Sequence, residues 1–223
     1  MPKGERLARI KQSPNFRDGA FQNQSVTPQL TDGATYGKVM KEFLFGRPKR
    51  ATPSSDIPSM KTDLLNLDRG ENILVWFGHS SYFMQLDGKR ILVDPVLSGS
   101  ASPFSFMTKA FKGADRYTTD DLPAIDYLFL SHDHYDHLDY KTIVKLKPKV
   151  HKIICGLGTG EHLEYWGYDH ERIIEKDWNE SFELDHGFTV HTVPSRHFSG
   201  RWLKRNQALR TSFVLQTPGL RLF

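Results

Sequence analysis

The residues of this chain best suited to chemistry lie together in residues 131–137, which read SHDHYDH. Their spacing is His-x-His-x-Asp-His, and the four metal-capable side chains are His132, His134, Asp136 and His137. Neutral imidazoles and carboxylates bind zinc and iron alike. One pair of such groups would mean little, but four at this spacing indicate a metal site. The alternative is a polar, solvated loop that happens to be rich in histidine and aspartate.

A buried strand and a helix are expected to flank this motif. Residues 125–130 are apolar and follow Pro123, which predicts a buried strand. Residues 139–147 place apolar side chains among lysines behind an aspartate, which predicts a helix. The motif therefore lies on a strand-to-helix loop, where functional residues are common.

Hairpins and short helices are predicted for the rest of the body. Asp87-Gly88 is a strong two-residue turn signal, and the glycine-rich residues 156–160 indicate a turn into a helix rather than a cofactor loop. His186 is expected to be a turn residue, and Cys155 a small core residue. The predicted strands are 73–77, 82–86, 90–93, 150–155, 172–175, 181–184, 188–193, 211–215 and 220–223, with a helix at 161–166.

Composition excludes several classes of protein. The 223 residues are 38% hydrophobic and 25% charged, which is typical of a soluble globular protein. The single cysteine excludes an internal disulfide framework and a cysteine-based zinc site. No window approaches the ~20 apolar residues that a membrane span needs, and no secretory signal opens the chain. The compartment stays open, with a cytoplasmic or membrane-associated location favoured.

Residues 1–60 are predicted to form a basic N-terminal arm with one short helix, at residues 36–45. The arm holds ten Lys/Arg and five Asp/Glu, a net charge of +5. A basic arm can face anionic lipid or nucleic acid, but a solvated arm lying over the domain is favoured. Nucleic acid is disfavoured because the arm lacks the interleaved aromatic residues that stack on bases. Residues 61–223 are predicted to form the globular domain.

The motif at 131–137 resembles the signature of the metallo-β-lactamase superfamily. Residues 75–82 (VWFGHSSY) and 91–95 (ILVDP) look like the branch that contains N-acyl-phosphatidylethanolamine-hydrolysing phospholipase D and L-ascorbate-6-phosphate lactonase. Residues 194–201 (PSRHFSGR) and 209–215 (LRTSFVL) match the phospholipase D side better. The resemblance implies an α/β fold, the four-layer αββα sandwich of that superfamily.

The resemblance also implies two divalent metal ions, with zinc expected first and iron or manganese as alternatives. His132, His134 and His197 would hold one ion, and Asp136 and His137 the other. The attacking group would be a metal-bound hydroxide rather than a serine or cysteine. Asp136 would orient that hydroxide and is therefore the expected catalytic residue.

The family's pattern extends past the last residue of this sequence. A bridging aspartate and a final histidine ligand of the family lie beyond the position of Phe223. We therefore expect the chain to be the N-terminal part of the sandwich, C-terminally incomplete. A longer parent chain or an oligomer would then complete the site.

Other residues near the motif bear on substrate and on ligand geometry. His79 could reach the site, although a hydrogen-bonded structural role is favoured. Asp94, at a strand end, is expected to fix the tautomer of a ligand histidine. A basic cluster could hold a phosphate or be an ordinary exposed loop, with equal weight for the two, and comprises Arg196, Arg201, Lys204 and Arg205.

The resulting hypothesis is a metal-dependent hydrolase. The expected reaction is phosphodiester cleavage of the phospholipase D type, on an N-acyl-phospholipid-like substrate, with membrane-surface contact through the arm. One alternative is a lactonase or other ester hydrolase on the same scaffold, with a small-molecule substrate. Another is a fragment that binds metal without catalysis.

Overall fold

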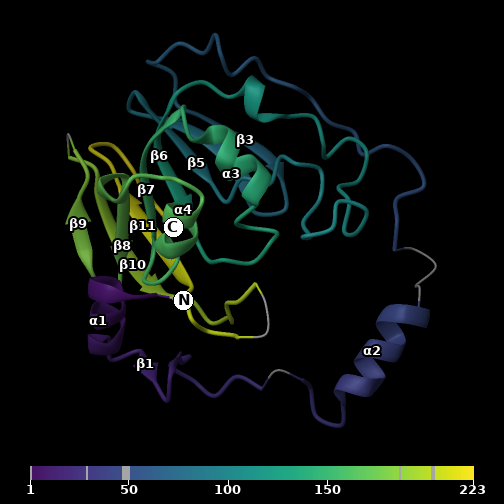
Figure 1. Cartoon of the computed structure of the whole chain (residues 1–223). Coiled ribbons are helices and arrows are strands. Elements are labelled where there is room, and N and C mark those ends of the chain that lie inside the picture. The colour runs from purple at the N-terminus through teal and green to yellow at the C-terminus, as the bar shows by residue number, and fades with distance from the viewer. Residues whose placement is uncertain (1, 29, 47–50, 186, 202–203) are drawn as a thin grey trace.

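Two β-sheets that face each other form the body of the chain in the computed structural model (Figure 1). The structure describes all residues except 1, 29, 47–50, 186 and 202–203. The prediction for His186 lies outside the described residues. Among the described residues, no helix is both long enough and apolar enough to cross a membrane.

The larger sheet is mixed and has six strands in the order of the chain. Neighbouring strands pair antiparallel from the first to the third strand and parallel from the third to the sixth. The strands are β3 (Ile73–Gly78), β4 (Ser81–Leu86), β5 (Lys89–Val93), β6 (Ile125–Leu130), β7 (Val150–Gly156) and β8 (Ile173–Lys176). β6 spans the predicted 125–130, and it lies between two parallel neighbours, as expected of a buried strand.

The smaller sheet is antiparallel, in the order β12-β11-β10-β9. Its strands are β9 (Ser181–Glu183), β10 (Thr189–Pro194), β11 (Thr211–Gln216) and β12 (Arg221–Leu222). A two-stranded ribbon, β1 (Phe16–Arg17) and β2 (Ala20–Phe21), precedes both sheets. The helices are α1 (Gly4–Gln12), α2 (Tyr36–Phe45), α3 (Tyr140–Leu146) and α4 (Gly160–Tyr165), with 3₁₀ turns at Thr119–Asp121 and His170–Arg172.

The two faces of the larger sheet bury different partners, because successive side chains of a strand point to opposite faces. On β6, Leu128 and Leu130 join the core that α3 and α4 cover. Tyr127 and Phe129 point the other way and pack against the smaller sheet. Cys155 is a buried free thiol in the first core, as predicted. The layers are therefore helix, sheet and sheet, which are three of the four layers of the predicted αββα sandwich.

The N-terminal segment is more ordered than a solvated arm. The sequence predicted one helix in residues 1–60, and the described part of this segment has two. Ile10 of α1 and Phe21 of β2 are buried against Trp178 and Leu209 of the body. Arg6 forms ion pairs with glutamates of the body, as described below. Residues 4–23 are thus docked, although the division into arm and domain stays a prediction.

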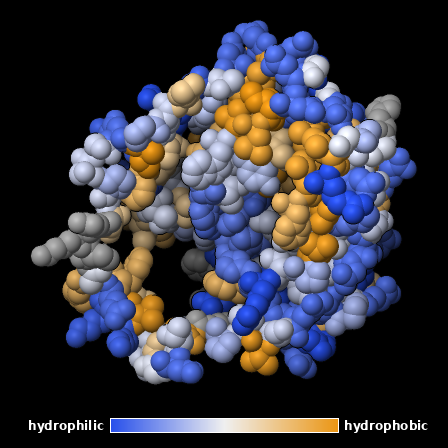
Figure 2. All heavy atoms as spheres, turned by 180° about the vertical axis from the view of Figure 1, so that it is seen from behind, coloured by the Kyte–Doolittle hydropathy of each residue, from blue (hydrophilic) through white to orange (hydrophobic). Residues whose placement is uncertain are grey.

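The helix α2 differs from α1, because none of its residues is buried. It lies away from the sheets, at the lower right of Figure 1. Phe43 and Phe45 are among its exposed apolar side chains. Figure 2 shows apolar and charged side chains together on this part of the chain, at the lower left of that view.

Candidate metal centre

The sheet topology brings the His-x-His-x-Asp-His motif and Asp94 to one edge. β5 and β6 run parallel, so their carboxyl ends lie at the same edge of the sheet. Asp94 follows β5 directly, and residues 131–137 follow β6. The backbone N–H of Asp94 donates to the carbonyl of Phe129 at 3.0 Å, which ties the two strand ends together. Ligand-binding residues of open α/β sheets collect at such an edge.

Three histidines form the first candidate metal group: His132, His134 and His197. His197 lies in the loop after β10, so the group joins the two sheets. The Nε2 of His132 and the Nδ1 of His134 are 3.0 Å apart. The ring of His197 lies edge-on to both, with centroids at 4.8 and 5.0 Å.

The chemistry of this first group fits a metal ion. Burial and the neighbouring histidines lower the pKa of His132 to about 2. Burial likewise lowers the pKa of His134 and of His197. Their imidazoles are therefore neutral, which is the form that binds metal. The buried Nε2 of His134 has no hydrogen-bond partner among the described residues, and a buried polar atom of this kind calls for a partner.

A second candidate group contains His79, Asp136 and His137. The Nε2 of His79 is 3.0 Å from the Oδ2 of Asp136, and the Nε2 of His137 is 3.8 Å from the same oxygen. The two groups are neighbours, because the rings of His132 and His137 have centroids 4.0 Å apart. One carboxylate and two imidazoles are a donor set that first-row divalent metals accept.

Asp94 supports the second group through a hydrogen bond with His137. Its buried carboxylate accepts hydrogen bonds from the N–H and the Oγ of Ser131, at 2.8 and 2.6 Å. It also accepts from the Nδ1 of His137 at 2.8 Å. Burial by itself would lower the pKa of His137, but the hydrogen bond and charge of Asp94, with the charge of Asp136, outweigh it and raise the pKa. The predicted contact between Asp94 and a motif histidine is confirmed.

Asp133, a motif residue to which the sequence assigned no role, links the motif to the loop of His197. Its buried carboxylate accepts from the N–H of Gly200 at 2.7 Å and faces His162 at 3.5 Å. Burial by itself would raise the pKa of Asp133, but these hydrogen bonds lower it. Asp133 is thus a structural acceptor that holds residues 197–200 over the motif.

Two arginines of the basic cluster contact other segments of the chain. Arg201 donates to the carbonyls of Asp133 and Leu138, at 3.0 and 2.5 Å, and its guanidinium stacks on the ring of Tyr135. Arg196 donates to Thr27 of the arm. These arginines hold segments of the chain in place, which favours the structural interpretation for both.

The N-terminal segment contacts the first group through residues that sequence reasoning missed. The Oδ1 of Asn23 accepts from the backbone N–H of His197 at 3.3 Å and from the Nη2 of Arg210 at 2.6 Å. Arg210 is 1% exposed and also donates to the carbonyl of Phe21. Arg210 lies in the quoted residues 209–215, but a single sequence carries no sign of its pairing with Asn23.

The structure thus places all five sequence-predicted ligands at one site and adds His79. The first group contains three of the predicted ligands, and the second contains Asp136 and His137 with the added histidine. Metal binding by these residues, and the catalytic role of Asp136, stay predictions.

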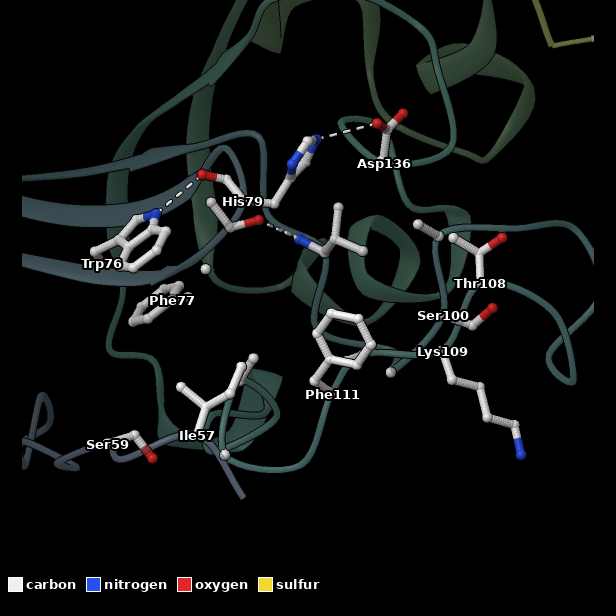
Figure 3. Close-up of a pocket in the computed structure, with 18 of the residues that line it drawn as sticks. Ile57, Ser59, Trp76, Phe77, His79, Ser100, Thr108, Lys109, Phe111 and Asp136 are labelled. Carbon is white, nitrogen blue, oxygen red and sulfur yellow. Dashed lines mark hydrogen bonds and ion pairs between the residues drawn. The ribbon is translucent and has the colours of Figure 1, made fainter. Parts of the chain in front are cut away.

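An apolar cavity opens beside the second group. It has a volume of about 590 Å³ and is bordered by His79 and Asp136 at one end (Figure 3). Trp76 and Phe77 line it from β3, and Phe111 lines it from the loop between β5 and β6. The imidazole of His79 points toward Asp136, at the polar end of this cavity (Figure 3).

Residues 89–223 match the family described as Beta-lactamase superfamily domain. An uncharacterised protein of Mycobacterium tuberculosis is 37% identical over 214 residues, which cover 96% of this chain and 57% of that protein. The N-acyl-phosphatidylethanolamine-hydrolyzing phospholipase D 1 of Caenorhabditis elegans is 33% identical over 142 residues, 57% of this chain and 38% of that protein. Other relatives are named as metal-dependent hydrolases.

A diiron β-hydroxylase from Streptomyces venezuelae shares the fold, with a TM-score of 0.50 and 24% identity over 68% of this chain and 28% of that one. The chain spans 57% of the length of the mycobacterial relative. The predicted superfamily and fold class are confirmed. Because the family match covers more than half of the chain, the chain belongs to the β-lactamase superfamily.

Proposed function

We propose that this chain carries the metal-binding part of a hydrolase that cleaves a phosphodiester bond in a phospholipid-like substrate. The observation that carries the proposal is the position of the second candidate metal group, whose His79 and Asp136 border the polar end of an apolar cavity, with the first group beside it. An apolar cavity of this size accommodates an acyl chain, and the metal groups beside it would receive the polar headgroup. The name of the nematode relative supports the same substrate class.

The residues have separate roles in this proposal. His132, His134 and His197 hold one divalent ion, and Asp136 and His137 take part in holding a second. Divalent ions bound in such a pair of sites lower the pKa of water and polarise a phosphoryl or acyl oxygen. Asp136 accepts a hydrogen bond from the attacking water and orients it toward the substrate. Zinc, iron and manganese all suit these donors.

The test compares substrates that share an acyl chain. The chain is loaded with zinc, iron or manganese, and its metal content is measured. It is then assayed with N-acyl-phosphatidylethanolamine in mixed micelles, and with a lactone and a carboxyl ester of matching chain length. We expect about two ions per chain and metal-dependent turnover of the phosphodiester.

Two variants control this assay. The double variant His132→Ala, His134→Ala should lose metal and turnover together, and circular dichroism checks that it folds. The matched control His151→Ala removes an exposed histidine of β7 and should change neither. Faster cleavage of the lactone or the ester would instead support the lactonase alternative. Two bound ions without turnover of any substrate would support a binding role.

We also propose that the N-terminal arm contacts an anionic membrane surface. Residues 1–60 carry a net charge of +5, and α2 exposes apolar side chains between Lys38 and Lys41. Apolar and basic groups on one helix are typical of interfacial helices. Flotation with phosphatidylserine vesicles should retain the chain, and the double variant Lys38→Glu, Lys41→Glu should weaken this retention. Equal retention by phosphatidylcholine vesicles would contradict the electrostatic part of the proposal.

A further inference from the structure

The loop after β3 places a further imidazole, that of His79, at the site. We propose that His79 is a protein ligand of the second metal ion, together with Asp136 and His137. The proposal rests on the proposed metal-dependent function and names a ligand outside the His-x-His-x-Asp-His motif. It replaces the structural role that the sequence favoured for His79.

The distances among the three side chains suit a shared ion. One potential ligand atom from each of the three lies within 4.8 Å of the others. The closest pair, the Nε2 of His79 and the Oδ2 of Asp136, is 3.0 Å apart. The rings of His79 and His137 meet edge-on, with centroids at 5.3 Å. Each residue can therefore turn a donor atom toward one common point.

The backbone before β4 is shaped to aim His79 at this point. His79 has a φ of +49°, in the left-handed region that a non-glycine residue rarely adopts, and Gly78 before it has a φ of +110°. The β3–β4 register is irregular between Trp76 and Gly78, and such irregularities re-aim side chains next to active sites. The indole N–H of Trp76 donates to the carbonyl of His79 at 2.9 Å and holds the turn. Unusual backbone of this kind collects at ligand sites.

The hydrogen bonds of neighbouring residues keep the required donor atoms facing one another. The Nδ1 of His137 is bonded to Asp94, so its Nε2 is the nitrogen that faces the group. The Oγ of Ser80 donates to the carbonyl of Asp136 at 3.3 Å, which joins the turn of His79 to the motif loop. Among the described residues, the second group without His79 has two donors adjacent in sequence. His79 gives it three protein ligands, the number that catalytic zinc sites use while an open position remains.

The test separates a ligand from a hydrogen-bond partner of Asp136. The 223-residue chain is stripped of metal and titrated with Co²⁺, and the paramagnetically shifted imidazole N–H signals are counted by proton NMR. Two ions held by five histidines predict five such signals in the wild-type chain. His79→Ala should show four signals at saturating Co²⁺ and should bind the second ion at least 100-fold more weakly. His151→Ala, which removes an exposed histidine, serves as the matched control.

Each outcome decides the proposal. Five signals in the wild-type chain and four in His79→Ala support it. Equal numbers of signals in both chains overturn it, even if the affinity falls, because His79 then acts only on Asp136. Binding of a single ion by the wild-type chain also overturns it. Absence of any Co²⁺ binding overturns the metal-dependent function as well, and absence of turnover alone leaves the inference about His79 intact.

Discussion

Replacement of Asp94 by asparagine tests how the second metal group is supported. Asp94 is 3% exposed and accepts three hydrogen bonds, two from Ser131 and one from the Nδ1 of His137. Asparagine keeps one acceptor oxygen but places an NH₂ group where the second oxygen was. If the remaining oxygen accepts from the N–H of Ser131, the NH₂ faces the Nδ1–H of His137. Two donors then oppose each other, and the imidazole must move its proton to Nε2.

The expected magnitude follows from these contacts. A His137 protonated on Nε2 cannot bind a metal through that nitrogen. Loss of such an outer-shell partner weakens metal affinity by about 10- to 100-fold, which corresponds to ~1.4–2.7 kcal/mol. Hydrogen bonds to a charged group contribute about 1.5–3 kcal/mol each, against about 1 kcal/mol for neutral ones. The metal-free Asp94→Asn chain should therefore lose ~1–3 kcal/mol of unfolding free energy.

Two measurements check this prediction, a zinc titration against a competing chelator and urea unfolding of the metal-free chain. Asp126→Asn is the matched control. Asp126 also accepts a backbone N–H, that of Arg90 at 2.8 Å, but it lies at the opposite end of β6. Asp94→Asn should weaken the second ion and leave the first nearly unchanged, and the control should change neither affinity. A second-ion affinity within about twofold of wild type in Asp94→Asn would refute the argument, since tautomer control predicts at least tenfold.

The remaining predictions concern the docked N-terminal segment and the cavity. Arg6 lowers the pKa of Glu164 to about 2 through their hydrogen bond, so the stabilisation is fully present above the unfolded pKa of about 4.3 and is lost as pH falls toward 2. The metal-free wild type should therefore be more stable than Glu164→Gln at neutral pH, by at most about 3 kcal/mol before solvent screening lowers that limit. This difference in unfolding free energy should shrink as the pH falls from about 4.3 toward 2. Asn23→Ala should weaken the first ion by about 10- to 100-fold, because Asn23 holds the backbone of His197; zinc titration measures this. Ala110→Trp should fill part of the cavity and exclude about two methylenes of a bound acyl chain. Because each methylene contributes ~0.8 kcal/mol, KM for a long-chain substrate should rise by more than about tenfold.

Matched controls exist for these variants. Asn15→Ala removes another hydrogen bond between the arm and the body, from Asn15 to Asp177, and should leave zinc affinity unchanged. Ala51→Trp adds a tryptophan at an exposed position outside the cavity lining and should leave KM unchanged. A constant difference between wild type and Glu164→Gln from pH 7 to 3 would contradict the ion-pair argument. Equal KM values for short-chain and long-chain substrates in Ala110→Trp would show that the acyl chain binds elsewhere.

The parts of the fold that depend on local pattern were predictable. The strand 125–130 and the turn at Asp87-Gly88 are confirmed, because an apolar run and a turn dipeptide act over few residues. The motif itself identified four of the six side chains that the two groups contain, and the resemblance at residues 194–201 identified a fifth, His197. The helix α1 was not predicted, because its apolar content is low. Its position depends on the ion pairs of Arg6 with Glu164 and Glu175 of the body.

The residues that were missed, and those whose role the sequence left open, depend on contacts between distant parts of the chain. His79 reaches Asp136 across 57 residues, through a left-handed turn that no local pattern announces. The pairing of Asn23 with Arg210 spans 187 residues. In the sequence, Arg201 looks like an ordinary charged residue of a basic loop. Only the structure shows that its guanidinium lies over the ring of Tyr135.

The contact of Asn23 with His197 and Arg210 also has a consequence for the order of events in folding. Synthesis proceeds from the N-terminus at about 5–20 residues per second, so Asn23 is made long before Arg210 exists. In the interval the nascent chain displays His132 and His134 before His197, the third imidazole, and Arg210 have been made. Contacts of such sequence separation also form late, because closing a long loop costs chain entropy first. Metal acquired by the first group before that closure would be held by two histidines and would exchange readily, so we expect stable loading only after the two distant segments have met.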